Sequence, residues 1–159
     1  MSHDRNVDVV VAGTGVAALA AAISAADAGL KVLMLESTDR WGGSSALSGG
    51  GLWLPNNPLM QRDGAGDSRE DALAYLEATI GDAGPATSRK RKEAFVDGVA
   101  GFVGLAERHG ITFARAADYP DYYPERPGGK IGRAVEVEPF DTKRIGAWWE
   151  TSRGQDGLP

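Results

Sequence analysis

The hydrophobic positions of this chain fall into short unbroken runs and longer periodic stretches. Apolar runs occupy residues 9–12 and 32–35, and such runs are typical of strands buried on both faces of a parallel sheet. Between them, residues 16–28 are rich in alanine and leucine and lack proline, which favours a helix ending at Gly29. The pattern therefore predicts a strand, helix and strand unit, a βαβ core, over residues 7–37.

Two further helices are expected over residues 68–81 and 88–109. Ser68 can cap the first, in a capping-box pattern with Asp in place of the preferred Glu. Four cations at residues 89–92 begin the second and are interpreted as a solvated face. The apolar positions that we expect to face a core are Leu73, Leu76 and Ile80 in the first helix, and Phe95, Val99, Phe102, Leu105 and Ala106 in the second. Both helices are interpreted as packing elements.

The remainder of the chain, residues 111–159, alternates between short strands and irregular segments. Residues 111–114 and 134–138 alternate apolar and polar side chains as strands do. Residues 118–129 contain three prolines, three tyrosines and two glycines, which favours an ordered loop. The tail from residue 143 carries two adjacent tryptophans and is rich in turn-forming residues.

A glycine-rich turn joins the first strand to the first helix. Residues 13–18 read Gly-Thr-Gly-Val-Ala-Ala and match the G-x-G-x-x-G/A pattern of a dinucleotide site. Gly13 can adopt the angles of a tight turn, Gly15 lets a pyrophosphate approach the main chain, and Ala18 allows close helix packing. The unpaired amides at the start of the helix would then point at the phosphates.

The second apolar run ends at Glu36, where an acidic side chain can accept hydrogen bonds from a ribose diol. A 2′-phosphate would place a second negative charge beside Glu36, so NADP is the poorest dinucleotide candidate. The alternative is an ordinary βαβ unit whose glycines serve packing alone.

The segment over residues 40–57 is predicted to form a flavin-binding loop. Residues 42–51 hold five glycines and three serines, a composition that neither helix nor strand propensity explains. Successive amides and small hydroxyls can cradle a second phosphate and the sugar-alcohol chain of a flavin. A flexible linker is the alternative, but linkers of this composition lack interleaved apolar anchors such as Trp41, Leu47 and Leu52.

Composition narrows the remaining function classes. The 159 residues are 42% hydrophobic and 25% charged with a formal net charge of -5, which gives no footprint for nucleic acid or an anionic membrane. The chain has no cysteine, and neither His3 nor His109 has a neighbour at metal-ligand spacing, so no metal site is expected. The N-terminus lacks the features of a signal or transmembrane segment, which predicts a cytoplasmic location.

These motifs together resemble a known family. The combination of residues 13–18, Glu36 and the run GGSSALSGGGLWLPNN at residues 42–57 is similar to the N-terminal part of the FAD-dependent fumarate reductase and 3-ketosteroid dehydrogenase superfamily. The similarity is greatest to the 3-ketosteroid Δ1-dehydrogenases. It implies an α/β fold with a Rossmann-like FAD-binding βαβ unit and appended helices. It also implies that this chain is the incomplete N-terminal portion of a larger flavoprotein, either a truncated reading frame or one piece of a split protein, with the substrate domain absent.

The resemblance also assigns roles to individual residues. Relatives that attach FAD covalently through histidine carry it where Ser44 and Ser45 lie here, so a non-covalent flavin is implied. A Pro-Asp-Tyr sequence in the relatives brings a catalytic tyrosine to the active site, and the matching residue is Tyr122, for which loop packing is the alternative. The cofactor-binding residues implied are Gly13, Gly15, Val16, Ala17, Ala18, Glu36, Ser37, Gly43, Ser44, Ser45, Ser48, Gly49 and Gly50.

The implied activity is dehydrogenation of a ketosteroid-like substrate by hydride transfer to flavin N5, with a tyrosine taking the neighbouring proton. A small-molecule substrate and an external electron acceptor are then the expected partners. Three alternatives remain open: a fumarate reductase or succinate dehydrogenase-like flavoprotein, a catalytically inactive FAD-binding fragment, and an NAD-dependent dehydrogenase. The last gives no role to the glycines of residues 42–51.

Overall fold

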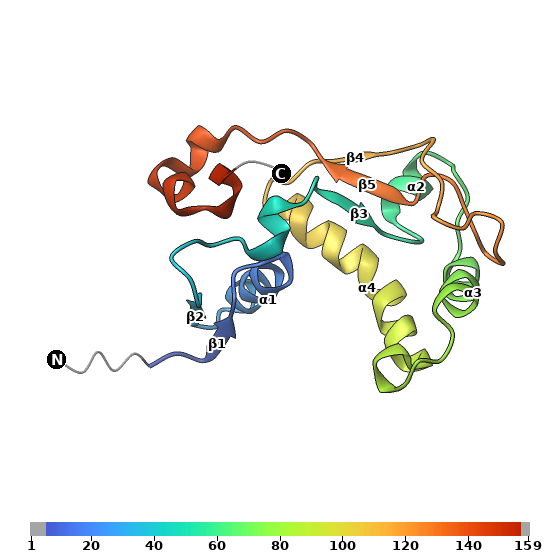
Figure 1. Ribbon diagram of the computed structural model, residues 1–159, viewed down its shortest axis with the longest axis horizontal. Helices are drawn as coiled ribbons and strands as arrows, with labels where there is room; N and C mark the ends of the chain where they lie inside the picture. Colours follow the sequence, from blue (N-terminus) through green and yellow to red (C-terminus); the bar gives the residue numbers. More distant parts are fainter. Residues whose placement is uncertain (1–5, 157–159) are drawn as a thin grey trace. The chain divides into compact units, whose positions relative to one another are not determined.

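The computed structural model describes residues 6–156, which contain both helices and strands (Figure 1). The chain divides into two compact units. Among the described residues, the first unit contains residues 6–50 and 140–156, and the second contains residues 51–139. His3 lies outside the described residues.

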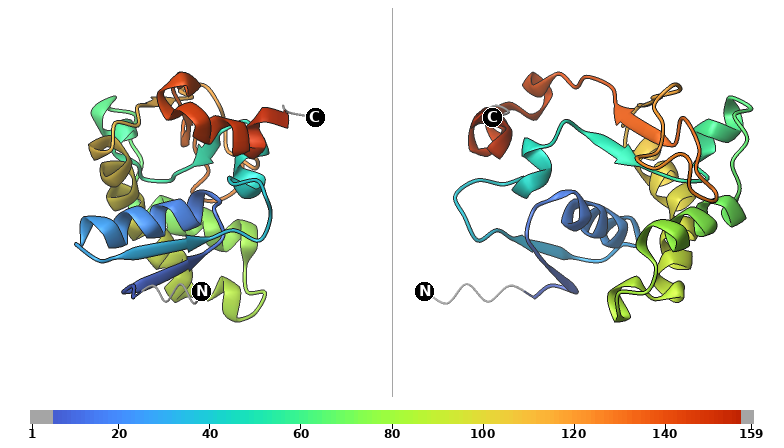
Figure 2. Two further views of the ribbon diagram at one scale, coloured as in Figure 1. Left: turned by 90° about the vertical axis from the view of Figure 1, so that its left-hand side faces the viewer. Right: turned by 45° about the vertical axis from the view of Figure 1, so that its right-hand side comes forward.

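The first unit is built on two parallel strands and one helix. Strand β1 (Val9–Ala12) pairs with β2 (Val32–Leu35) in a register that runs from Val9 opposite Val32 to Ala12 opposite Leu35. Helix α1 (Val16–Asp27) connects the strands and lies against them (Figure 2). The order matches the predicted strand, helix and strand. Burial on both faces does not, because the described sheet has only two strands and leaves Val10 and Leu35 exposed.

Three short 3-10 helices complete the first unit. They are η1 (Gly43–Leu47), η3 (Thr142–Thr151) and η4 (Arg153–Asp156). Trp41 joins the beginning and the end of the chain, because its amide donates to the Thr151 carbonyl at 3.1 Å and its carbonyl accepts from the Arg153 amide at 2.9 Å. The turn-rich tail is therefore helical over much of its described length.

The second unit contains a three-stranded antiparallel sheet. Its strands are β3 (Gly51–Trp53), β4 (Phe113–Arg115) and β5 (Ala134–Val137), in the order β3-β5-β4. Sequence analysis predicted β4 and β5 within one or two residues. It placed β3 inside a loop, because glycine disfavours a strand locally and the partner strand lies about eighty residues further along the chain.

The second unit also contains four helical segments: α2 (Pro58–Arg62), α3 (Arg69–Ile80), the 3-10 turn η2 (Pro85–Thr87) and α4 (Arg89–Arg108). The sequence pattern did not predict α2, although Asn57 caps it by accepting from the Met60 amide at 2.9 Å. The side chain of Ser68 caps α3 by accepting from the Asp71 amide at 3.0 Å. Ser88 makes no capping side-chain hydrogen bond at the start of α4.

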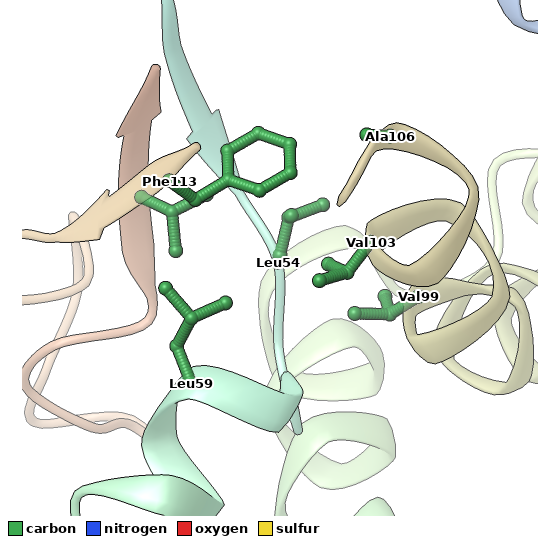
Figure 3. Close-up of a cluster of buried hydrophobic side chains, with 7 residues drawn as sticks. Leu54, Leu59, Val99, Val103, Ala106 and Phe113 are labelled. Carbon is green, nitrogen blue, oxygen red and sulfur yellow. The ribbon is translucent and has the colours of Figure 1, made fainter. Parts of the chain in front are cut away.

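The main core lies between α4, the sheet and α2 (Figure 3). Its buried members are Leu54, Leu59, Val99, Val103, Ala106, Phe113 and Val135. The predicted stripe on α4 was partly wrong. The buried face passes through Val96 and Val103, whereas Phe95 is 43% exposed. Both sets of residues have helical spacing, so only the neighbouring elements decide which face of α4 is covered.

Lys92 also departs from the predicted solvated face. The other three cations of residues 89–92 are exposed, but Lys92 is buried. Its Nζ donates to Oε2 of Glu77 at 2.5 Å and to the carbonyl of Gly81 at 2.7 Å. Because carbonyls at a helix end lack intrahelical partners, the ammonium group satisfies the C-terminus of α3.

A buried arginine connects three segments of the second unit. The Nε and Nη2 of Arg133 donate to the two carboxylate oxygens of Asp67, each at 2.8 Å, and Nη1 donates to Asp121 at 2.8 Å. The other oxygen of Asp121 accepts from the Trp53 indole nitrogen at 2.7 Å. Arg133, just before β5, thus anchors the segment that leads into α3 and also the Tyr/Pro-rich loop of residues 118–129.

The charges of this cluster are maintained by hydrogen bonding. Burial opposes ionisation of Asp67, but donors from Arg133 and from the amides of Asn56 and Ser68 outweigh it and lower the pKa of Asp67. Burial likewise opposes the charge on Arg133, and the two aspartates outweigh it and raise the pKa of the guanidinium. Removing the cation would therefore leave two buried carboxylates without their counter-charge.

We predict that Arg133→Met destabilises the protein by about 3–5 kcal/mol, because breaking a buried ion cluster leaves uncompensated charge. Urea unfolding followed by circular dichroism measures the effect. Arg89→Met is the matched control, since Arg89 forms an exposed pair with Glu93 at 2.9 Å, and such pairs contribute at most about 1 kcal/mol. Equal effects of the two substitutions would contradict the assignment of Arg133 as an anchor.

Candidate functional site

The turn between β1 and α1 presents the start of a helix whose own N-cap residue supplies no capping side chain. Gly13 has a φ of +94°, a region that favours glycine, and its amide donates to the Leu35 carbonyl at 2.6 Å. Helix α1 begins directly after Gly15, which makes no side-chain cap. Backbone amides and the positive end of the helix dipole at such a terminus attract anions.

The Gly/Ser-rich segment of residues 40–57 packs next to this turn. Gly42 has a φ of +109°, and a Cβ there would lie 2.6 Å from the Cβ of Ala46, so only glycine fits. A Cβ on Gly43 would lie 3.5 Å from the Cα of Gly15. The hydroxyl of Ser45 accepts from the amide of Val16 at 3.1 Å. A hydroxyl oxygen therefore occupies an acceptor position at the first amide of α1.

Glu36 lies at the end of β2 and receives several hydrogen bonds. Its Oε2 accepts from the Thr14 hydroxyl, and its Oε1 accepts from the amides of Ser37 and Thr38 at 2.9 and 3.2 Å. The Thr14 bond is the largest cause, partial burial opposes it, and the Ser37 and Thr38 donors add to it, so that the pKa of Glu36 falls from 4.5 to about 2. The carboxylate consequently stays ionised well below pH 4.5.

Thr14 connects the three motifs of the site. Besides donating to Glu36, its hydroxyl oxygen accepts from the Gly42 amide at 2.9 Å. Sequence analysis did not select Thr14, which occupies a variable position of the glycine pattern. The pairing of the two parallel strands could have indicated this contact. Because Ala12 pairs with Leu35, the hydroxyl of Thr14 lies within reach of the Glu36 carboxylate.

A cavity of about 700 Å³ opens beside these residues within the first unit. Thr14, Glu36 and Arg144 supply its polar side chains. Leu19, Met34, Trp41, Ile145 and Trp148 supply its apolar side chains. The combination of an ionised carboxylate with an apolar lining suits a ligand that carries both hydroxyl groups and a flat ring.

The remaining predicted cofactor residues occupy less specific positions. Ala17 is exposed and Ala18 is half-buried on α1. Both the amide and the hydroxyl of Ser37 donate to Glu36, at 2.9 and 3.2 Å. Ser44, Ser48, Gly49 and Gly50 are exposed within or after η1. The structure thus brings Gly43 and Ser45 to the glycine turn. The other predicted residues of the segment stay exposed to solvent.

Tyr122 belongs to the second unit, where its side chain is 86% exposed. Its neighbour Asp121 is buried and holds the loop, accepting from the Lys130 amide at 2.9 Å as well as from Arg133. Tyr122 lines a cavity of about 260 Å³ together with Trp53 and Tyr119. The loop is therefore anchored through Asp121, and the phenol of Tyr122 stays exposed.

The described residues lack both a membrane-spanning helix and a metal-binding cluster. None of the helices in residues 6–156 is long and apolar enough to span a bilayer. Within the same residues, no group of three or more histidine, aspartate or glutamate side chains could hold a metal ion. The cytoplasmic location stays a prediction.

Comparison with known proteins identifies the family. The family described as an FAD binding domain matches residues 8–156, so the chain belongs to this FAD-binding family, and FAD is the cofactor that the match assigns. This confirms the flavin prediction and disfavours the NAD-dependent alternative.

Individual relatives narrow the class further. The chain is 42% identical over 144 residues to a 3-oxosteroid 1-dehydrogenase of Mycolicibacterium smegmatis, covering 89% of this chain and 25% of the relative. It is 38% identical over 132 residues to a 4-oxocyclohexanecarboxylate 2-dehydrogenase of Sinomonas cyclohexanicum, covering 82% and 23%. The chain thus spans about a quarter of the length of these relatives.

A solved structure agrees with the sequence matches. The crystal structure of 3-ketosteroid delta1-dehydrogenase from Sterolibacterium denitrificans, in complex with 1,4-androstadiene-3,17-dione, superposes with a TM-score of 0.83 at 37% identity. The match covers 92% of this chain and 26% of that one. The predicted resemblance to the 3-ketosteroid dehydrogenases is therefore confirmed.

We predict that Thr14→Val raises the pKa of Glu36 from about 2 towards 4.5, because the strongest hydrogen bond to the carboxylate is lost. An NMR pH titration of the Glu36 side-chain carboxyl carbon measures the change. Thr112→Val, at an exposed threonine of the second unit, is the matched control. A Glu36 pKa that stays near 2 in the variant would assign the shift to Ser37 and Thr38 instead.

The same shift predicts a dependence of stability on pH. The folded-state pKa of Glu36 lies below its ordinary value, so its contribution is complete above pH 4.5 and is lost as the pH falls towards about 2. Thr14→Val should therefore be less stable than the unsubstituted protein above pH 4.5, with the difference shrinking in acid. Thermal unfolding across this range tests the sign, and a difference that grows in acid would contradict it.

Proposed function

We propose that this chain binds FAD non-covalently as part of an oxidoreductase that removes hydrogen from a carbon next to a ring ketone, with ketosteroids as the first substrate class. The observation that carries the proposal is the Thr14 hydroxyl, which links the glycine turn, Glu36 and the Gly/Ser-rich segment around one cavity. The family match supports the cofactor, and the activities of the related 3-oxosteroid and 4-oxocyclohexanecarboxylate dehydrogenases support the substrate class.

The local geometry supports a Rossmann-like role for the β1-α1-β2 unit. The first amides of α1 would hold the pyrophosphate, where the Ser45 hydroxyl already serves as an acceptor for Val16. Glu36 would accept from the adenosine ribose through Oε2, which receives one donor here, whereas Oε1 receives four. Neither Gly43 nor Gly15 carries a side chain, so a phosphate beside them would approach the backbone directly.

The cofactor and the protein have separate chemical roles in this proposal. FAD, when bound, supplies the ring whose N5 accepts a hydride. The chain positions the cofactor and keeps a negative charge at Glu36, which would repel a 2′-phosphate. Tyr122 is the group proposed to act on the substrate proton or carbonyl, since an exposed phenol on an anchored loop can donate a hydrogen bond to a carbonyl.

The two relatives named above suggest the common substrate feature. One relative is named for a 3-oxosteroid and the other for 4-oxocyclohexanecarboxylate, and both compounds contain a six-membered ring with a ketone. A ketone acidifies the adjacent C–H bond when its oxygen is hydrogen-bonded. We therefore propose a ring ketone as the substrate and place the larger steroid first, because the 3-oxosteroid dehydrogenase is 42% identical to this chain and the 4-oxocyclohexanecarboxylate dehydrogenase 38%.

Titration of the 159-residue chain with FAD, NAD and FMN tests the cofactor assignment. We expect binding of FAD, seen as a shift of the flavin absorbance bands, and weaker or no binding of NAD. Glu36→Ala should weaken FAD binding about tenfold, because hydrogen bonds to a charged group contribute about 1.5–3 kcal/mol. Glu70→Ala, an exposed acid in the first turn of α3, is the control. A folded chain that takes up no flavin would refute the proposal.

The role of Tyr122 can be tested in a hybrid enzyme. The matching segment of the Mycolicibacterium smegmatis dehydrogenase is replaced by this chain, and reduction of a dye by a 3-oxosteroid is followed. We expect Tyr122→Phe to lower kcat about a hundredfold or more, the range for a lost acid or base group. Tyr119→Phe, which alters a second exposed tyrosine of the loop, is the control. Equal activities of the two variants would assign Tyr122 to packing alone.

A further inference from the structure

We propose that the segment Thr142–Thr151, which forms η3, is an adenine strap, and that Trp148 stacks on the adenine of FAD. The inference rests on the proposed FAD binding and adds to it a set of residues far from the glycine motif in sequence. Three strap residues, Arg144, Ile145 and Trp148, line the same cavity as Thr14 and Glu36.

The position of the cavity argues for adenine as the occupant. A base is joined to the carbon next to the ribose diol, so a ribose bound at Glu36 places its base within one ring width of that carboxylate. The cavity beside Glu36 is lined largely by apolar side chains, including Trp41 and Trp148. A flat aromatic ring fills such a space and stacks on indole.

The strap is attached to the residues that directly follow Glu36. The indole nitrogen of Trp41 donates to the carbonyl of Trp148 at 2.8 Å, and the Trp41 amide donates to Thr151 at 3.1 Å. Nη2 of Arg153 donates to the hydroxyl of Thr38 at 3.1 Å. The backbone of Trp148 is thus fixed relative to the acidic end of β2.

The Trp148 side chain contrasts with its fixed backbone. It is 72% exposed, although a tryptophan ring gains much by leaving water. Its neighbour Trp149 packs against Gly154, where an added Cβ would lie 3.2 Å from the indole ring. Trp149 therefore packs within the first unit, whereas Trp148 presents an exposed ring to the cavity.

A kink in the strap brings its lining residues to one side. Gly146 has a φ of 54° and a ψ of -131°, which interrupts η3 and is strained for residues with a side chain. Arg144 and Ile145 precede the kink, Trp148 follows it, and all three face the same cavity. The kink thus allows two successive turns to contribute to one binding surface.

Titration of ADP and of FAD into the 159-residue chain by calorimetry tests the strap. ADP carries the adenosine without the flavin, so it reports on the adenine contact alone. We expect Trp148→Ala to weaken the binding of both ligands about tenfold, the effect of losing one aromatic stacking partner. Trp148→Phe should retain most of the affinity, and ADP should quench tryptophan emission less in this variant than in the unsubstituted chain.

Two controls separate a binding effect from misfolding. Tyr119→Ala removes an exposed aromatic side chain of the second unit that lines a different cavity, and it should leave ADP affinity unchanged. Far-UV circular dichroism and thermal unfolding of Trp148→Ala should match those of the unsubstituted chain, because the ring is largely exposed.

The possible results distinguish the strap from the function on which it rests. Binding of ADP that is equal in the unsubstituted chain and in Trp148→Ala would overturn the strap and leave FAD binding intact. An equal loss of affinity for FMN, which has no adenine, would place the flavin against Trp148 and overturn the adenine assignment. A folded chain that binds neither ADP nor FAD would refute the proposed function and the strap with it.

Discussion

The hydroxyl of Thr14 is the interaction on which the first unit depends. A backbone amide can only donate, so the bond from Gly42 requires the hydroxyl oxygen to accept and leaves its proton for Glu36. One side chain thereby fixes the distance between the glycine turn, the acid and the Gly/Ser-rich segment. It also lowers the pKa of the Glu36 carboxyl to about 2, so the negative charge beside the cavity persists well into the acid range.

Arg133 has the corresponding role in the second unit. Burying a guanidinium and two carboxylates costs solvation, and the cluster is favourable only because nearly every polar atom has a partner. The consequence reaches Tyr122 through Asp121, the residue before it. A loop rich in proline and tyrosine is held by a buried charge, and its phenol stays uncovered without making the loop loose.

The two units differ in how their candidate functional residues are supported. In the first unit, the site residues are themselves joined by hydrogen bonds, and the chain end returns to them through Trp41. In the second unit, the exposed Tyr122 is supported indirectly by buried neighbours. This difference explains why substitutions around Glu36 should alter ligand affinity, whereas substitutions around Arg133 act first on stability.

Local patterns in the sequence predicted the parts that depend on nearby residues. The order of β1, α1 and β2, the glycine turn and the capping of α3 by Ser68 all follow from residues within a few positions of one another. The family resemblance identified the cofactor because glycine spacing and the terminal acid are constrained by the ligand itself. These features can be predicted from the sequence because local steric constraints and hydrogen bonding determine them.

The tertiary structure decided the features that require distant partners. Strand β3 forms because β5 supplies its hydrogen bonds, and Val96 rather than Phe95 faces inward because neighbouring helices cover that side of α4. Lys92 is buried because the end of α3 needs a donor, and Trp148 reaches the cavity because Trp41 fixes its carbonyl. A sequence states which groups can pair or pack, whereas the fold selects the partners, since each choice depends on atoms brought together from remote positions.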